Sequence, residues 1–251
     1  MTENERVGHS QDYFGDYRDF WWNPDFVELM ATRLGWSAAK RVLDVGCGAG
    51  HWTRTIAPHL SPQTSITAID NDPKWTDPNA AWLQDLIDRG LDLKISAGNA
   101  ETIPFPDETF DFVTCQTVLI HLLDPQRAIS EMLRVLKPGG LLLCSEPDNF
   151  GTSWAVSSLS LSLSLDDEAE VFKFYLAQDR GRKALGLGDT SFGGLLPDVF
   201  VKSGLSDMQV YLSDKAMPLF WPYSTPEQHA LLGDTEHWFE SAVDFSRVHS
   251  H

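Results

Sequence analysis

Basic residues are scarce in this chain of 251 residues. Lys and Arg number 19 against 36 Asp and Glu, which gives a formal net charge of -17 at pH 7. The acidic residues are spread along the chain and do not form a tail. A surface that binds duplex nucleic acid needs clustered Lys and Arg. The composition therefore argues against a nucleic-acid partner and favours an acidic, well-solvated surface.

Long apolar runs are also missing. No stretch of 18 apolar residues occurs, so we expect no membrane span. The first residues, MTENERVGHSQDYF, lack the apolar centre of a secretory signal, which favours a cytoplasmic location. Only three cysteines are present, and none has metal-ligand spacing: Cys47, Cys115 and Cys144. All three lie in or beside predicted strands, which favours reduced thiols and no metal site.

Short apolar segments alternate with helical patterns through the first 150 residues. This alternation predicts an α/β fold whose parallel sheet is covered by helices on both faces. A KPGG sequence at Lys137–Gly140 is expected to end one helix and to lead into the fifth strand, LLLCSE. The other expected strands are 41–45, 65–70, 92–96 and 110–116, and the expected helices are 50–59, 79–89 and 125–136.

The flanking segments are less regular. Gln11–Leu34 has a helical, aromatic-rich pattern in which Pro24 is placed to start a second helix. The Ser/Leu run Ser157–Leu165 fits a strand or one face of a helix. Further on, the pattern predicts a helix over Leu195–Ser203, a strand over Met208–Leu212 and a terminal helix over Thr225–Phe239 with Pro226 in its first turn.

The most informative segment is VLDVGCGAG, from Val42 to Gly50. A buried strand ends at Asp44, three glycines follow, and a helical pattern begins at His51. Glycines in such a turn let a ligand approach the backbone, and the N–H groups of the helix face it. A dinucleotide-binding turn, G-x-G-x-x-G, requires a glycine where this chain has His51. The spacing here is D-x-G-x-G-x-G, and a glycine-rich turn without a ligand is the alternative.

A second acidic residue, Asp70, ends the next predicted strand, 20 residues beyond Gly50. A carboxylate in this place accepts hydrogen bonds from the two hydroxyls of a ribose. Nicotinamide-binding folds share the feature, so it indicates a nucleoside without choosing the cofactor. The following Asn71–Asp72–Pro73 is a turn sequence, so a turn role for Asp70 is the alternative.

Three further segments extend the pattern: GNAETIPFPDETFDFV (98–113), CQTVLIHLLDP (115–125) and LRVLKPGGLLLCSEP (133–147). Together with D-x-G-x-G-x-G, they resemble the class I S-adenosylmethionine-dependent methyltransferases, in their type 11, UbiE-like branch. The resemblance covers about Tyr13 to Pro147. It implies S-adenosyl-L-methionine as the cofactor.

The resemblance also assigns cofactor contacts. It implies that the backbone of Gly46, Gly48 and Gly50 packs against the methionine and ribose, and that Asp44 binds the methionine amino group. Asp70, with Asn71 beside it, would bind the ribose. The adenine edge would meet Asn99, where Asp is common, and the backbone of Ala100. The Asn99 oxygen would accept from the adenine amino group, or its NH₂ would donate to a ring nitrogen. Gln116 would touch the cofactor at the end of the fourth strand.

Other positions carry weaker expectations. His121 lies where relatives often have His near the sulfonium, so it would orient the acceptor or take a proton; a structural His is the alternative. Glu146, at the end of the fifth strand, is a second acid–base candidate. Arg18 would pair with the methionine carboxylate if the aromatic N-terminal segment forms a lid. Packing of that segment against the sheet is the alternative, because Tyr13, Tyr17, Phe20 and Trp21 share one helical face.

The fold implied is a Rossmann-like, mostly parallel sheet of seven strands, with helices on both faces and its last two strands after Ser206. An insertion after strand five would span about 150–190. Three regions are expected: an N-terminal aromatic helical lid (1–34), a cofactor-binding core (35–150) and a substrate-side insertion with late strands and a C-terminal helix (151–251).

The function implied is transfer of a methyl group, by in-line displacement, to a small-molecule acceptor. Alignment of the reacting atoms and exclusion of water would supply much of the acceleration. A general base is needed only for a poorly nucleophilic acceptor. The acidic charge and the aromatics Trp154, Phe172, Phe174 and Phe192 favour a small, partly apolar acceptor. The alternatives are a nicotinamide-dependent oxidoreductase and a cofactor-binding regulator that performs no transfer.

Overall fold

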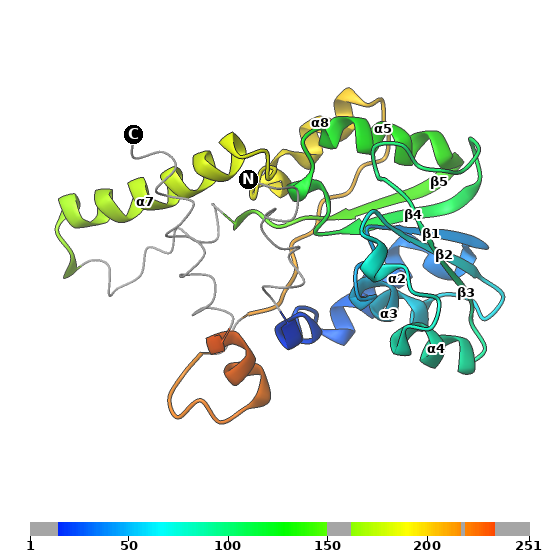
Figure 1. The fold of residues 1–251 in the computed structure, drawn as a ribbon, viewed down its shortest axis with the longest axis horizontal. Coiled ribbons are helices and arrows are strands. Elements are labelled where there is room, and N and C mark those ends of the chain that lie inside the picture. Colours follow the sequence, from blue (N-terminus) through cyan, green and yellow to red (C-terminus); the bar gives the residue numbers. More distant parts are fainter. Residues whose placement is uncertain (1–14, 150–161, 217–218, 234–251) are drawn as a thin grey trace.

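The computed structural model describes residues 15–149, 162–216 and 219–233. Its centre is a parallel sheet of five strands in the order β3-β2-β1-β4-β5 (Figure 1). Because β1 pairs with both β2 and β4, the order reverses next to β1, and ligands in such sheets bind at that point. The strands are β1 (Arg41–Val45), β2 (Ser65–Asp70), β3 (Asp92–Ala97), β4 (Phe110–Gln116) and β5 (Leu136–Ser145).

The sequence predicted β1, β2 and β4 with these bounds, and β3 extends one residue further than expected. The fifth strand differs, because it begins at Leu136 and includes the KPGG sequence. The ladder accommodates these residues with an irregularity: Phe110 pairs with Leu136, but Phe112 pairs with Leu141. Pro138 has no N–H to donate to a regular ladder, so an irregular stretch is where the strand tolerates it.

Helices connect and flank the strands. Pro24 begins α2, as the sequence predicted, and a short 3-10 turn takes the place of the expected first helix. The helical segments are η2 (Gly15–Phe20), α2 (Pro24–Leu34), η3 (Trp36–Ala38), α3 (His51–Ile56), η4 (Ala57–His59), η5 (Pro73–Trp75), α4 (Ala81–Asp88), η6 (Leu119–His121), α5 (Pro125–Val135), α7 (Leu165–Ala184), η8 (Phe192–Leu195) and α8 (Leu196–Lys202).

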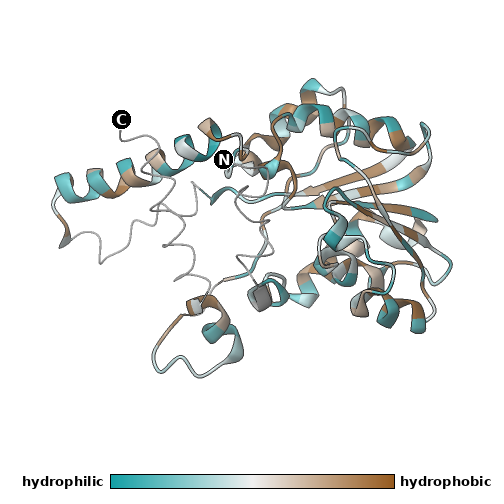
Figure 2. Cartoon of the chain, in the orientation of Figure 1, coloured by the Kyte–Doolittle hydropathy of each residue, from teal (hydrophilic) through white to brown (hydrophobic). Residues whose placement is uncertain are grey.

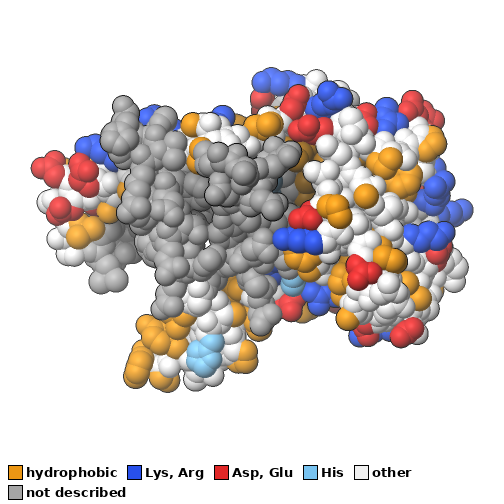
Figure 3. Space-filling model, in the orientation of Figure 1, with side chains coloured by type: hydrophobic (Ala, Val, Ile, Leu, Met, Phe, Trp, Pro, Cys, Tyr) orange, Lys and Arg blue, Asp and Glu red, His pale blue; other side chains and the backbone are white. Residues whose placement is uncertain are grey.

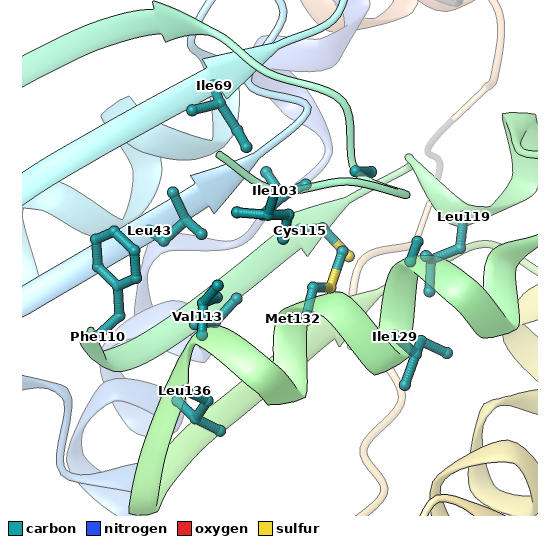
Figure 4. Close-up of a cluster of buried hydrophobic side chains, with 14 of the residues drawn as sticks. Leu43, Ile69, Ile103, Phe110, Val113, Cys115, Leu119, Ile129, Met132 and Leu136 are labelled. Atoms are coloured by element: carbon teal, nitrogen blue, oxygen red, sulfur yellow. The ribbon is translucent and has the colours of Figure 1, made fainter. Parts of the chain in front are cut away.

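Each face of the sheet is covered by its own hydrophobic cluster. Helices α2, α3 and α4 lie on one face, and α5 and α8 lie on the other (Figure 1). Successive strand residues alternate between the clusters: Val42 faces α2 and α3, whereas Leu43 faces α5. Figure 4 shows the α5 cluster, in which Met132 and Ile129 lie over the strands. Hydrophobic residues accordingly run along the strands (Figure 2).

The sheet has five strands in the part of the chain that the structure describes, so the expected seven are not formed there. The strand predicted over Met208–Leu212 is wrong, because these residues pair with no strand. Tyr211 packs against the α2 cluster and under Arg33, and Asp214 accepts from Asn23 Nδ2 at 3.0 Å. These contacts hold the segment at α2, on a face of the sheet, where no strand edge is available to it.

The C-terminal helix is present over 226–233, and its predicted end lies outside the described residues. Tyr13, Trp154 and most of the Ser/Leu run also lie outside them. Helix α7 occupies part of the expected insertion and extends away from the sheet (Figure 1). Figure 3 shows hydrophobic side chains gathered at the lower left, and the segment there includes Phe220 and Trp221, which are 61% and 81% exposed. Within the described residues, no helix is long and apolar enough to cross a membrane.

Candidate functional site

The glycine turn lies between β1 and α3, at the carboxyl ends of the strands. Gly46, Gly48 and Gly50 all have positive φ (73°, 49° and 75°), which side chains rarely tolerate. The N–H groups of Gly46 and Cys47 donate to the Ile69 carbonyl, at 2.8 and 3.0 Å, and so tie the turn to β2. Gly50 caps the first turn of α3.

Two side chains from neighbouring elements pack closely against this turn. A Cβ at position 46 would lie 2.5 Å from Val118 Cγ2, in the loop after β4. A Cβ at position 50 would lie 2.4 Å from the ring of Trp82, on α4. Only glycine therefore fits at both positions. The turn is held between the loop after β4 on one side and α4 on the other.

Asp44 is buried beneath the turn. Its Oδ2 accepts a hydrogen bond from Oγ1 of Thr53, the third residue of α3, at 2.5 Å. Its Oδ1 is buried and has no hydrogen-bond partner among the residues that the structure describes. Burial raises the pKa of Asp44 to about 7; the Thr53 hydrogen bond lowers the pKa, and nearby Asp70 raises it further. A buried carboxylate oxygen without a donor is costly unless a ligand satisfies it. Asp44 thus has the chemistry to receive a cationic group.

Asp70 connects the glycine turn to the end of β2. Its Oδ2 accepts from the Gly48 N–H at 2.9 Å, and its Oδ1 accepts from the Asp72 N–H at 2.9 Å. The turn role considered from the sequence is therefore real. Each carboxylate oxygen of Asp70 can accept a further hydrogen bond, so both oxygens remain available to a ligand. Asn71, between them, is exposed.

Asn99 lies just beyond β3, one residue after Gly98, whose N–H donates to the Asp70 carbonyl at 2.9 Å. The Asn99 side chain is exposed, and its Oδ1 accepts from the Glu101 N–H at 2.8 Å. The oxygen is thus used in a local turn, and the NH₂ group of this exposed side chain remains as a donor. Of the two contacts foreseen for Asn99, this arrangement favours donation to a ring nitrogen. Ala100 is buried beneath it.

The loop that follows is fixed by a residue that sequence reasoning missed. Arg134 of α5 donates to the carbonyls of Ile103 and Phe105, at 2.9 and 2.8 Å. It also pairs with Glu131 and Asp107. Glu131 in turn accepts from the Ile103 N–H at 2.9 Å. A cation that bridges carbonyls distant in sequence leaves no spacing signal there, although the Glu131–Arg134 pair at i, i+3 was visible.

Strand β4 ends at Gln116, which is half-buried, and the loop after it begins with Thr117, whose φ is +56°. Glu146, at the end of β5, holds this loop. Its Oε1 accepts from the Val118 and Leu119 N–H groups at 2.9 and 3.0 Å, and its Oε2 accepts from the Ile120 N–H at 3.3 Å. Burial raises the pKa of Glu146 to about 7, against these three hydrogen bonds, which lower it.

His121 ends the short turn η6 that this loop forms. The segment after α7 packs directly on it. A Cβ at Gly188 would lie 2.0 Å from the Ile120 carbonyl oxygen, and one at Gly193 would lie 2.4 Å from that of Glu146. Residues from the C-terminal half of the chain therefore cover both the turn that ends at His121 and the end of β5, where Glu146 lies.

The N-terminal segment is attached to the start of α3. Asp19 Oδ1 lies 2.8 Å from His51 Nδ1 and 3.2 Å from Arg54 Nη2. Burial lowers the pKa of His51, and Arg54 lowers it further. The Nδ1 of His51 lies within hydrogen-bond distance of Asp19 Oδ1 and, at 2.9 Å, of Arg54 Nη2. Arg18 is half-buried over the ring of Trp21, 5.0 Å from its centroid. The His51 that breaks the dinucleotide pattern serves here as an anchor for η2, a role the sequence did not indicate.

No group of three or more His, Cys, Asp or Glu side chains suited to a metal ion occurs within residues 15–149, 162–216 and 219–233. The three cysteines are free thiols; two are buried.

The part of the chain that contains this corner resembles known proteins. Residues 43–144, from within β1 to the last residues of β5, match the family model described as a methyltransferase domain. This part of the chain is therefore similar to that family. The resemblance inferred from the motifs is confirmed for this part of the chain.

Individual relatives cover the same region. A demethylmenaquinone methyltransferase of Geobacillus sp. (strain WCH70) is 35% identical over 126 residues, which is 50% of this chain and 51% of that protein. The uncharacterized methyltransferase YcgJ of Bacillus subtilis is 29% identical over 144 residues, 57% of this chain and 54% of that protein. The chain thus spans about half the length of the curated relatives it matches.

Solved structures show the same fold. The crystal structure of YcgJ from Bacillus subtilis covers 73% of this chain and 69% of its own, with 24% identity and a TM-score of 0.50. A Methanococcus maripaludis structure covers 82% of this chain and 84% of its own, with 20% identity and a TM-score of 0.50. The chain therefore has an α/β, Rossmann-like fold.

Proposed function

We propose that this chain is an S-adenosylmethionine-dependent methyltransferase that binds its cofactor at the glycine turn and methylates a small, partly apolar acceptor. The observation that carries the proposal is the buried Asp44 Oδ1, which lacks a donor among the described residues. It lies below a turn whose glycines leave no room for side chains. The methionine amino group supplies the positive charge and the N–H donors that this oxygen lacks.

The other contacts follow from the geometry of the corner. Asp70 would accept from the ribose hydroxyls while it holds Gly48, and the Asn99 NH₂ and the Ala100 backbone would read the adenine edge. Arg18 would pair with the methionine carboxylate, because η2 is held at the start of α3 through Asp19.

S-adenosylmethionine supplies an electrophilic methyl group on a sulfonium. The chain's own contribution would be to bind and orient the cofactor and to exclude water from the reacting atoms. His121 would orient the acceptor or take its proton. The buried Glu146 carboxylate is engaged by three backbone N–H groups, so we assign it to holding the loop and not to proton transfer.

The regional assignments remain part of this proposal: a lid over 1–34, a cofactor core over 35–150 and an acceptor-side region over 151–251. Their support is the packing of Gly188 on the loop after β4 and of Gly193 on the residues that follow β5. Because several relatives are named demethylmenaquinone methyltransferases, a quinol-type aromatic ring is the first acceptor class to assay. Exposed aromatics such as Phe220 and Trp221 are compatible with an apolar acceptor.

Cofactor binding is tested by calorimetry with S-adenosylhomocysteine, and NADH serves as the rival ligand. We expect binding of the first and none of the second. Asp70→Ala should weaken binding by about 100-fold, because it removes acceptors for the ribose and frees Gly48. Asp85→Asn, an exposed carboxylate on α4 paired with Arg89, is the matched control. Unchanged affinity in Asp70→Ala overturns the ribose assignment.

Transfer is tested with methyl-labelled S-adenosylmethionine and a panel of aromatic diols, phenols and amines. Label recovered in an organic-soluble product supports an apolar acceptor. Tight binding of S-adenosylhomocysteine without transfer to any extract would instead indicate a cofactor-binding regulator.

A further inference from the structure

We infer that Glu146 is a positioning residue that fixes the loop after β4 against the glycine turn, and so couples the acceptor-side cover to the cofactor corner. The inference rests on the proposed function, because the ligand used to test it is the cofactor product. It assigns Glu146 no contact with substrate or cofactor. Its role is to set the place of Val118 and of the turn that ends at His121.

The hydrogen-bond geometry carries the first step. Three consecutive N–H groups, those of Val118, Leu119 and Ile120, converge on the one carboxylate. Consecutive backbone donors that point the same way form an anion-binding concavity. Here the anion is a side chain from a neighbouring strand, and it satisfies donors that the short η6 turn itself leaves free.

The second step is the contact between this loop and the glycine turn. Val118, whose N–H is held by Glu146 at 2.9 Å, reaches position 46 so closely that a Cβ there would lie 2.5 Å from its Cγ2. A shift of Val118 therefore changes the space available above Gly46. The carboxylate acts on the cofactor corner through this valine.

The third step is the cover on the other side. Gly188 packs on the Ile120 carbonyl, and Gly193 packs on the Glu146 carbonyl and donates from its N–H to the Pro147 carbonyl at 3.1 Å. The segment that includes Gly188 and Gly193 thus contacts both partners of the Glu146 interaction. Release of the loop would loosen this cover and the glycine turn together.

The groups around Glu146 explain why its charge depends on the hydrogen bonds from the loop. Among the described residues, the titratable group in contact with it is Cys115 of β4, whose Sγ lies 3.6 Å from Oε1. Cys115 pairs with Cys144 between β4 and β5. Its neighbour Cys144, its burial and the nearby Glu146 and Asp44 carboxylates raise the pKa of the Cys115 thiol. None of these groups is a cation, so the three N–H donors, with the Cys115 thiol as a longer fourth donor, stabilise the carboxylate.

The test compares Glu146→Gln with Asp111→Asn. Asp111 also accepts two backbone N–H bonds, from Lys40 and Arg41 at 3.1 and 2.9 Å, and pairs with Lys137. It lies near the amino end of β4, whereas Glu146 lies at the carboxyl end of the neighbouring strand. Amide hydrogen exchange and the Kd for S-adenosylhomocysteine are measured for both variants. In Glu146→Gln, we expect the amides of residues 118–120 to exchange faster and the Kd to rise about tenfold. Asp111→Asn should lower the Tm without changing the Kd.

A double-mutant cycle with Val118→Ala separates positioning from simple stabilisation. If Glu146 acts through Val118, the two substitutions are strongly non-additive in Kd, because the second removes what the first acts upon. Additive effects, or a Kd in Glu146→Gln equal to wild type, overturn the inference. Glu146→Asp, which retains the charge, replaces Glu146→Gln if that variant does not fold. A wild-type protein that fails to bind S-adenosylhomocysteine overturns the proposed function instead.

Discussion

Thr53 donates its hydroxyl to Asp44 Oδ2 at 2.5 Å, from a residue nine positions further along the chain. The bond fixes the carboxylate so that its other oxygen stays buried and without a donor in the described part of the chain. An α3 side chain thus orients a β1 side chain toward the position of the proposed ligand. The pairing combines a costly burial with an ordered geometry, as functional sites often do.

Cofactor affinity should depend on pH through Asp44. Burial raises its pKa to about 7, so at pH 6 most of the carboxyl is protonated and a cationic amino group must displace the proton. We expect the affinity for S-adenosylhomocysteine to rise by up to about tenfold from pH 6 to pH 8, with proton release on binding. Calorimetry in buffers of different ionisation enthalpy measures both. Asp44→Asn should bind weakly and show a flatter profile; an unchanged slope would contradict the assignment to Asp44.

The stability of the ligand-free protein should fall as pH rises. Asp44 and Glu146 both have folded-state pKa values of about 7, raised by burial from 3.8 and 4.5. The folded state then binds more protons than the unfolded state between about pH 4 and pH 7, so the free energy of unfolding decreases across this window. We expect a lower Tm at pH 8 than at pH 5.5. Asp44→Asn should reduce the difference, and a Tm that rises with pH would refute the prediction.

Gly50→Ala should damage both the fold and the cofactor corner. The new Cβ would meet the Trp82 ring at 2.4 Å, in a backbone conformation with φ of +75°. The left-handed conformation alone costs about 1–2 kcal/mol for a residue with a side chain. We expect a lower Tm and a large loss of S-adenosylhomocysteine affinity. Adding Trp82→Ala removes the clash but not the conformational cost, so the double variant should recover part of the Tm.

Asn99→Asp should weaken cofactor binding. The Asn99 oxygen accepts from the Glu101 N–H. The substitution therefore replaces the remaining NH₂ donor of the side chain with a carboxylate oxygen, which can only accept. A ring nitrogen of adenine is itself an acceptor and would lose its partner, at a cost of about tenfold in Kd. Gln63→Glu, an exposed substitution of the same charge, serves as control. Tighter binding in Asn99→Asp would show that the adenine amino group is the partner, as in relatives with Asp.

The local features of this protein were legible in its sequence. Strands β1, β2 and β4 were predicted with the bounds found, because buried parallel strands are short apolar runs bounded by turn residues. The glycine spacing and Asp44 likewise indicated the ligand corner, since a D-x-G-x-G-x-G turn has few other uses. Pro24 marked the start of α2 because proline fits the first turn of a helix.

The features that sequence analysis predicted wrongly or did not predict depend on contacts between residues distant in the chain. Met208–Leu212 has an alternating pattern, but a strand exists only where a neighbouring backbone is free to pair, and tertiary packing placed this segment beside α2 instead. Glu146 read as an acid–base candidate, yet it lies 26 to 28 residues from the N–H groups it binds. Residue type and local spacing therefore determined the strands, the helix starts and the glycine turn, because these depend on backbone conformation and on burial of apolar residues. The tertiary structure alone decided which polar groups of the described residues were satisfied by the fold and which, like Asp44 Oδ1, were left without a donor.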